Sequence, residues 1–152
     1  MQLAWQQAEL AAIKGEVPVG AVLLLPDGQV FQAHNAPIER HDLSAHAEMQ
    51  VMRAACAAIG NYRLVDAQLF VTLEPCLMCA GAMVHARIGR LVYGASEPKT
   101  GAVVSLYQVL SDVRLNHQVE VVGGVMAEAC RAQLKAFFKA RRRSDKKMIE
   151  LS

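Results

Sequence analysis

Residues 67–86 read AQLFVTLEPCLMCAGAMVHA and contain the pattern on which the fold depends. Residues 67–73 alternate in polarity and are rich in strand formers, so they predict a β-strand. Pro75 ends this strand, and residues 76–86 have the composition of a helix. The stretch therefore predicts a strand followed directly by a helix, with two cysteines in the first turn of that helix.

The segments on either side of this unit continue the alternation of strands and helices. Residues 17–25 predict a buried strand, and the turn signal Pro26-Asp27-Gly28 leads into a second strand at 30–33. We further expect helices at 4–14, 45–59 and 127–143, the second capped by Ser44, short strands at 90–93 and 119–122, and loops at 34–44 and 97–101. This order predicts an α/β domain of three layers.

The composition fits one domain with its own hydrophobic core, since the chain has 152 residues of which 53% are apolar. No apolar stretch is long enough to cross a bilayer, because the best run, residues 17–25, is interrupted by Pro18 and Gly20. The N-terminus lacks the basic flank and apolar block of a signal peptide. We therefore expect a cytoplasmic protein with no membrane partner.

Positive charge is concentrated at the C-terminus. Residues 1–130 carry 8 basic and 12 acidic side chains, whereas residues 131–152 carry 8 basic and 2 acidic ones. A basic end on an acidic chain is typical of proteins that bind a polyanion such as nucleic acid. A solvated helical face with a frayed end explains the charge equally well. We expect a domain of residues 1–143 and a basic tail of residues 144–152.

Two of the four cysteines are closely spaced, which in the cytosol indicates metal or redox chemistry. Cys76 and Cys79 lie at a helix N-terminus, where unpaired N–H groups and the helix dipole favour thiolates. Cys56 and Cys130 stand alone in alanine-rich helical sequence, as small buried side chains do. The first pair is therefore the candidate for chemistry.

His46-Ala47-Glu48, at the start of another expected helix, completes a candidate metal site. His46, Cys76 and Cys79 make three ligands and leave a fourth tetrahedral position open, as in catalytic zinc sites. Zinc lowers the pKa of a bound water to about 7. Glu48 can carry the water's proton without ligating the metal. The sequence predicts one Zn²⁺ per chain, with Glu48 as general acid and base.

A lone Cys-x-x-Cys also occurs in zinc ribbons and in redox proteins. A ribbon needs a second ligand pair, which Cys56 and Cys130 do not make, and a thioredoxin-like motif follows the first strand of a different pattern. His-x-Glu with a downstream Pro-Cys-x-x-Cys is the signature of zinc-dependent nucleobase deaminases. This signature does not need the remaining histidines, which are His34, His41, His85 and His117.

Several longer blocks resemble one branch of these enzymes, the bacterial tRNA-specific adenosine deaminases that form inosine at the wobble position. The blocks are Glu16-Val17-Pro18-Val19-Gly20-Ala21-Val22, Asn35, His46-Ala47-Glu48, Asn61-Tyr62-Arg63-Leu64, Thr72-Leu73-Glu74-Pro75-Cys76, Met78-Cys79-Ala80-Gly81-Ala82-Met83, Lys99-Thr100-Gly101 and Phe137-Phe138. The metal motifs are shared by all relatives that deaminate bases. The blocks around Asn35, Lys99 and Phe137-Phe138 are more typical of the tRNA enzymes.

The resemblance implies a cytidine deaminase-like fold with a five-stranded mixed sheet, a homodimer, zinc, and a tRNA anticodon stem-loop as partner. It implies that Asn35 hydrogen-bonds the flipped adenine, although as a loop residue Asn35 needs no role beyond a turn. The other residues expected to contact the substrate are Val19, Ala47, Glu97, Lys99, Phe137, Phe138 and Arg141. At the position of Glu97 the family often has an aspartate.

Helical spacing predicts that one of Phe137 and Phe138 faces the core while the other is more exposed, either packing or stacking on an anticodon-loop base. Two rival functions stay open. One is a deaminase of a free base or nucleoside, of guanine or cytosine type; the basic C-terminus and the blocks at Asn35 and Lys99 argue against it. The other is a non-catalytic zinc-stabilised RNA-binding module, which has no use for Glu48.

Overall fold

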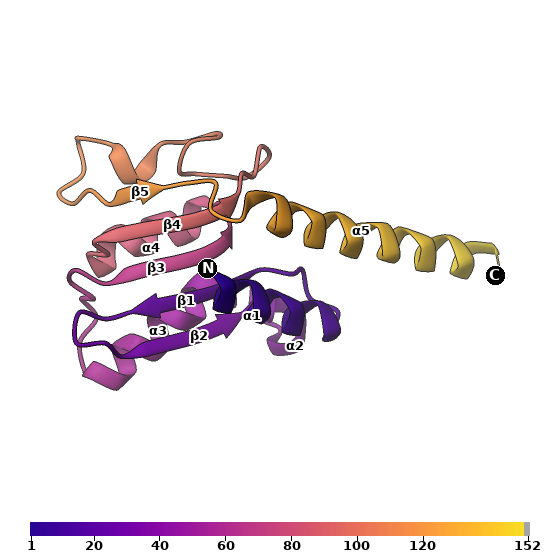
Figure 1. Ribbon diagram of the computed structural model, residues 1–152, viewed down its shortest axis with the longest axis horizontal. Helices are drawn as coiled ribbons and strands as arrows, with labels where there is room; N and C mark the ends of the chain where they lie inside the picture. Colours follow the sequence, from indigo (N-terminus) through magenta and orange to yellow (C-terminus); the bar gives the residue numbers. More distant parts are fainter. Residues whose placement is uncertain (151–152) are drawn as a thin grey trace.

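A five-stranded sheet forms the centre of the computed structural model, which describes residues 1–150 (Figure 1). The strands are β1 (Gly20–Leu24), β2 (Val30–His34), β3 (Gln68–Leu73), β4 (Arg90–Ala95) and β5 (Glu120–Val122), in the spatial order β2-β1-β3-β4-β5. β1 pairs antiparallel with β2 and β3, whereas β3, β4 and β5 are parallel. The mixed five-stranded sheet is therefore confirmed.

Helices cover both faces of the sheet and produce three layers. α1 (Gln2–Ile13) and α5 (Ala127–Glu150) lie on one face, and α3 (Ala47–Ile59) and α4 (Leu77–Ala86) lie on the other (Figure 1). The short helix α2 (Pro37–Arg40) and the 3-10 helix η1 (Val109–Ser111) lie in connections. Because β4 is enclosed by helices on both faces, it is a continuous apolar run that is buried from Leu91 to Ala95.

Small side chains bring α1 unusually close to the sheet. Ala4, Ala8 and Ala11 are its buried residues and are fully enclosed. A Cβ atom added to Gly20 of β1 would lie 2.0 Å from the carbonyl oxygen of Ala4, so only glycine fits there. This close contact holds the start of β1, and the loop before it, in a defined place.

One edge of the sheet gathers loops from four different strands. Val19 precedes β1, Asn35 follows β2, Glu74 follows β3 and the loop with Glu97 follows β4. Asn35 N–H donates to the carbonyl of Val19 at 3.0 Å, which ties the first two loops together. In open α/β sheets such an edge, beyond the carboxyl ends of parallel strands, is the usual place of a ligand site.

The helix starts differ from the sequence prediction at α3. This helix begins at Ala47, with His46 and not Ser44 in the N-cap position. The Ser44 hydroxyl instead donates to Asp42 Oδ1 at 2.7 Å. The carboxamide oxygen of Asn35 accepts the hydrogen bond from Ala47 N–H at 2.9 Å. The Asn35 side chain therefore caps α3 in place of the expected Ser44.

β1 begins at Gly20 and not at residue 17. The loop at 34–44 and the end of α5 also differ from the prediction. The expected loop at 34–44 contains α2, which starts at Pro37, a residue whose fixed φ suits the first turn of a helix. α5 continues to Glu150 and does not end at Arg143, because arginine and lysine are good helix formers. Most of the expected tail is therefore helical, and residues 151–152 lie outside the described residues. Within the described residues, no helix is long and apolar enough to span a membrane.

Candidate metal centre and its pocket

Three potential metal ligands meet at the N-termini of two helices. His46 occupies the N-cap position of α3, Cys76 occupies that of α4, and Cys79 lies in the first turn of α4. The Nδ1 atom of His46 lies 3.6 Å from Cys76 Sγ and 3.5 Å from Cys79 Sγ. All three ligand atoms lie within 4.8 Å of one another, as the ligands of a single tetrahedral metal ion do. The site is thus preformed by the backbone.

The pKa values of the two thiols are displaced in opposite directions. A hydrogen bond from Cys79 lowers the pKa of Cys76 to about 4, and His46 contributes in the same direction. The same hydrogen bond, together with burial, raises the pKa of Cys79. The hydrogen bond to Cys76 also raises the pKa of His46. A divalent cation bound by both sulfurs would hold them as thiolates.

Glu48 is a buried carboxyl group beside these ligands, with only 4% of its surface exposed. It lies in the first turn of α3 and lines the same pocket as His46 and Cys76. Burial raises its pKa to about 7, while the nearby His46 acts in the opposite direction. A carboxyl group with a pKa near neutrality can both take up and release a proton at physiological pH.

A cavity of about 270 Å³ opens next to the metal ligands. Its lining residues come from the loops at the sheet edge and from the first turn of α3; they are Val17, Val19, Asn35, Pro37, His46, Glu48, Leu73, Glu74, Cys76, Glu97 and Thr100. The structure thus brings the predicted residues Val19, Asn35 and Glu97 to the metal centre. Ala47 is fully buried and is not among the lining residues of the cavity. Its N–H is the donor to Asn35 described above.

Asn35 presents one half of its carboxamide to this cavity. Its oxygen is occupied by the N–H of Ala47. Its Nδ2 group has no hydrogen-bond partner among the described residues, and Asn35 lines the cavity. A ligand with an acceptor nitrogen or oxygen can therefore be recognised by Asn35 without breaking an existing bond.

The loop after β4 contributes to two neighbouring hollows. The Glu97 carboxylate accepts a hydrogen bond from Lys99 N–H at 2.9 Å and so closes a turn. Glu97 and Thr100 line the metal-site cavity. Lys99 lines a second hollow of about 630 Å³ together with residues of α5, which we call the basic groove; its other members are Arg131, Leu134, Lys135, Phe138, Lys139 and Arg142.

Arg142 lines the basic groove, whereas Arg141, which was expected to contact the substrate, is not among its lining residues, so the role of Arg141 stays a prediction. Arg142 follows Phe138 by one helical turn and so shares its face of α5, whereas Arg141 lies about 100° away around the helix. Phe138 is 41% exposed and lines the groove. The rotation of α5 about its axis determines which arginine faces this hollow. That rotation depends on how the helix packs on the sheet.

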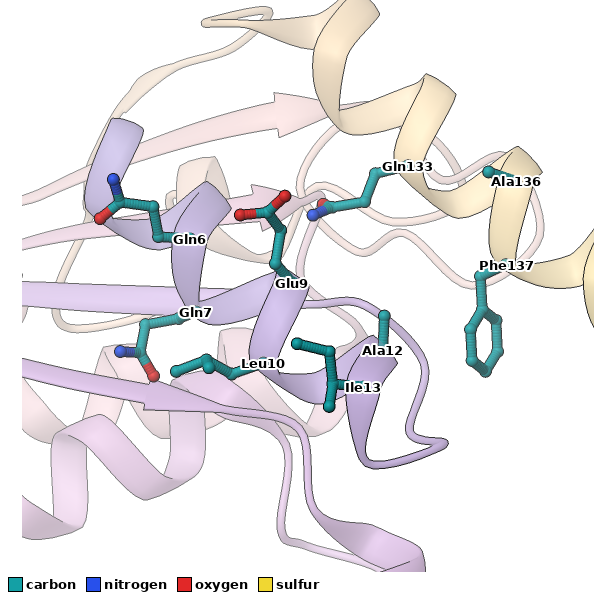
Figure 2. A pocket seen from close by; sticks show the side chains of 9 residues that line it. All are labelled: Gln6, Gln7, Glu9, Leu10, Ala12, Ile13, Gln133, Ala136 and Phe137. Atoms are coloured by element: carbon teal, nitrogen blue, oxygen red, sulfur yellow. The ribbon is translucent and has the colours of Figure 1, made fainter.

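Phe137 occupies a different place from Phe138. The two rings are in edge contact, with centroids 5.4 Å apart. Phe137 is half-buried and lines a hollow of about 610 Å³ between α1 and α5. The central core contains neither ring, although one of the two was expected there. Figure 2 shows its ring on the α5 side of this hollow, across from Ala12 and Ile13 of α1.

Sequence reasoning missed two residues that matter in the cavity, Glu74 and Thr100. Both stood in the blocks that carried the family resemblance, but no motif chemistry singled them out. Thr100 lines the cavity beside Glu97. Glu74 follows β3 directly and is 2% exposed. A charged residue at the end of a buried strand was the one available signal.

An open His-Cys-Cys site with a buried glutamate beside it defines the class of metal-dependent hydrolytic deaminases. The family model of MafB19-like deaminases matches residues 1–142. The chain is 47% identical to the tRNA-specific adenosine deaminase of Bacillus subtilis (strain 168), over 96% of this chain and 91% of that protein. It is 46% identical to the tRNA-specific adenosine deaminase of Haemophilus influenzae, over 96% and 85%. The chain therefore belongs to the tRNA-specific adenosine deaminase family.

Solved structures agree with this assignment. A structure from studies of A-to-I editing by tRNA:A34 deaminases at the wobble position of transfer RNA matches with a TM-score of 0.84 and 46% identity, covering 88% of this chain and 97% of that chain. Guanine deaminase from Nitrosomonas europaea matches with a TM-score of 0.76 over 90% and 81% of the two chains. At 18% identity the second likeness shows the fold alone.

The ligand assignment predicts the result of removing a single sulfur. Cys79→Ala should lose the bound metal, because two remaining ligands hold a divalent ion far more weakly than three. Metal content per chain, measured by inductively coupled plasma mass spectrometry, checks this. Cys130→Ala is the matched control, since Cys130 is also fully buried but packs on Gly94 of β4. Full metal content in Cys79→Ala would show that the ligands are assigned wrongly.

Proposed function

We propose that this chain hydrolyses adenosine to inosine at the wobble position of a tRNA anticodon loop, with one zinc ion held by His46, Cys76 and Cys79. The observation that carries the proposal is the buried Glu48 carboxyl group beside three preformed ligands, with a cavity next to them. The relatives of known specificity that share 46–47% identity support the choice of substrate.

Zinc fits the donor set, because two thiolates and an imidazole in tetrahedral reach are ligands that zinc prefers. When bound, zinc acts as a Lewis acid that lowers the pKa of water to about 7. The protein contributes the geometry: both helix N-termini point their N–H groups at the site, which favours the negative charge of the thiolates.

Glu48 moves the protons of the reaction. It takes one proton from the attacking water and delivers it to N1 of the adenine as the C6–O bond forms. It then takes the remaining proton of the new C6 hydroxyl and delivers it to the amine, so that the C6–N6 bond breaks, ammonia leaves and the C6 carbonyl of inosine forms. Its burial supports these roles, because a carboxyl group with a pKa of about 7 exchanges protons readily in both directions. Its position in the first turn of α3 keeps it beside the metal ligands.

Asn35 and the apolar walls hold the base. The Nδ2 group of Asn35 donates to an acceptor nitrogen of the adenine, while its oxygen stays bound to Ala47 N–H. Val17, Val19 and Leu73 line the same cavity and offer apolar contact to a base that has left the stack.

The basic groove favours RNA over a free base as the substrate. Lys99 lines the groove and lies in the same loop as Glu97 and Thr100, which line the metal-site cavity. Four further cationic side chains, at Arg131, Lys135, Lys139 and Arg142, line the groove. Their positive field suits the phosphates that flank a flipped nucleotide, and the exposed Phe138 ring offers a stacking surface. A free-base deaminase needs neither feature.

A comparison of substrates tests the function. The purified chain should form inosine, read by mass spectrometry, from an anticodon stem-loop with adenosine 34 and not from free adenosine, cytidine or guanine. Glu48→Gln should keep its metal but lose about a hundred- to ten-thousand-fold in turnover, since general acid–base catalysis is removed. Glu120→Gln, an exposed carboxylate paired with Arg90, is the control. Turnover of free guanine and not of RNA would favour the free-base alternative.

The groove predicts a measurable change in salt dependence. Replacing Lys139 and Arg142 with alanine should weaken binding of the stem-loop and reduce the slope of log affinity against log salt by about 0.7 for each lost phosphate contact. Metal content should not change. Arg90→Ala is a matched control, because Arg90 is an exposed arginine at the opposite end of β4. Equal salt slopes in the double variant and the original chain would count against RNA in this groove.

We also infer that the chain functions as a homodimer. Val104, Leu106 and Tyr107 are each more than half exposed, on the segment directly after the loop that borders the metal site. Large apolar side chains grouped in this way are typical of an interface. Sedimentation equilibrium should give twice the mass of the chain, and Leu106→Asp should shift it to the monomer. Val65→Asp, on the distant turn before β3, should leave the mass unchanged.

A further inference from the structure

Glu74 is a buried carboxylate that joins the metal-binding turn to the loop after β4. Its Oε1 accepts hydrogen bonds from the N–H groups of Val103 at 3.2 Å, Val104 at 2.8 Å and Ser105 at 2.9 Å. Its Oε2 accepts from Glu97 N–H at 2.9 Å and from the Ser105 hydroxyl at 2.5 Å. One side chain therefore holds both ends of the segment 97–105.

Backbone donors, and not a cation, satisfy the charge of this carboxylate. No salt bridge in the described part of the chain includes Glu74. Five hydrogen-bond donors surround its two oxygens instead, four of them backbone N–H groups and the fifth the Ser105 hydroxyl. Consecutive N–H groups that point at one oxygen form an anion-binding nest. Glu74 therefore acts as a built-in acceptor around which the loop folds.

The loop is fitted closely to Glu74. A Cβ atom at Gly101 would lie 2.4 Å from Glu74 Oε2, so the loop backbone approaches the carboxylate at a place where only glycine fits. The same strand end is tied to the loop twice more. Ala102 N–H donates to the Pro75 carbonyl at 2.8 Å, and Cys76 forms an isolated bridge with Gly101. Several contacts thus fix the position of the loop relative to the metal-ligand turn.

We propose that Glu74 is a positioning residue for the RNA substrate, and this inference rests on the proposed function above. By holding segment 97–105, Glu74 determines where Glu97, Lys99 and Thr100 lie relative to the metal site. Glu97 and Thr100 border the cavity for the target nucleotide, and Lys99 borders the basic groove. Glu74 therefore acts through the loop, and not on the reacting atoms.

A positioning role and a merely structural role have different kinetic signatures. If the loop moves while the metal ligands and Glu48 stay in place, substrate binding weakens and KM rises more than kcat falls. If Glu74 only stabilised the fold, its loss would reduce the fraction of active protein, which lowers kcat and leaves KM unchanged. A displacement of about 1 Å can cost about a hundredfold, so the change is measurable.

Glu74→Gln is the first test. Glutamine has one acceptor oxygen and places an NH₂ group against N–H donors, so the loop loses part of its anchor. We expect KM for the anticodon stem-loop to rise by about tenfold or more, with full metal content and a smaller fall in kcat. Glu120→Gln makes the same chemical change on an exposed carboxylate and should leave KM unaltered. If neither KM nor the mobility of segment 97–105 rises in Glu74→Gln, the proposal is wrong.

Gly101→Ala tests the contact from its other side. The added methyl group displaces the loop while Glu74 stays intact, so KM should rise in the same way. The double variant should add little to either single change, because both break one contact. Additive effects on KM would contradict the proposal. If Glu74→Gln does not fold, Gly101→Ala and Ser105→Ala replace it, and normal KM values in both would refute the positioning role.

Amide hydrogen exchange separates this inference from the proposed function. In Glu74→Gln, the N–H groups of Val104 and Ser105 should exchange faster while those of the core strand β3 do not change. This readout needs no substrate. Failure of the original chain to deaminate the stem-loop would defeat the proposed function alone, whereas unchanged exchange at Val104 and Ser105 would defeat the role of Glu74 as the loop anchor.

Discussion

The convergence of two helix N-termini on one point is the constraint on which the rest of the structure depends. α3 and α4 begin where the sheet ends, so the N-cap positions of His46 and Cys76 face each other. Partial positive charge at both helix ends favours sulfur in its ionised form, and burial on the same side makes the Glu48 carboxyl group reluctant to ionise. The pKa of Cys76 is therefore lowered while that of Glu48 is raised, so the carboxyl group and not the thiol is the group that can hold a proton near neutral pH.

The metal ligands and the layers could be predicted because their signals are local. Pro75-Cys76 and Cys79 lie within one helical turn, and the alternation of strands and helices is visible without tertiary knowledge. Asn35 was also predicted, but through the family resemblance. Its bond to Ala47, which makes it a cap for α3 as well as a cavity residue, joins positions whose relation appears only after β2 and α3 are placed.

The role of Glu74 and the place of Arg142 in the basic groove could not be predicted from the sequence. The partners of Glu74 are backbone N–H groups, which every residue possesses, in a segment without periodicity. The arginine that enters the basic groove depends on the rotation of α5 about its axis, and that rotation is set by packing against β4. Ser44 was chosen as a cap from propensity, which tertiary contact overrode.

The absence of a cation from the described contacts of Glu74 has a consequence for how salt acts on the enzyme. At physiological ionic strength, the attraction between exposed side chains and phosphates is largely lost beyond a separation of about 8 Å. A buried carboxylate held by backbone N–H groups is screened far less. Salt therefore affects the open groove and the buried loop anchor differently. In the proposed function, salt changes how often an RNA is captured, whereas the shape of the pocket proposed for the target nucleotide stays almost unchanged.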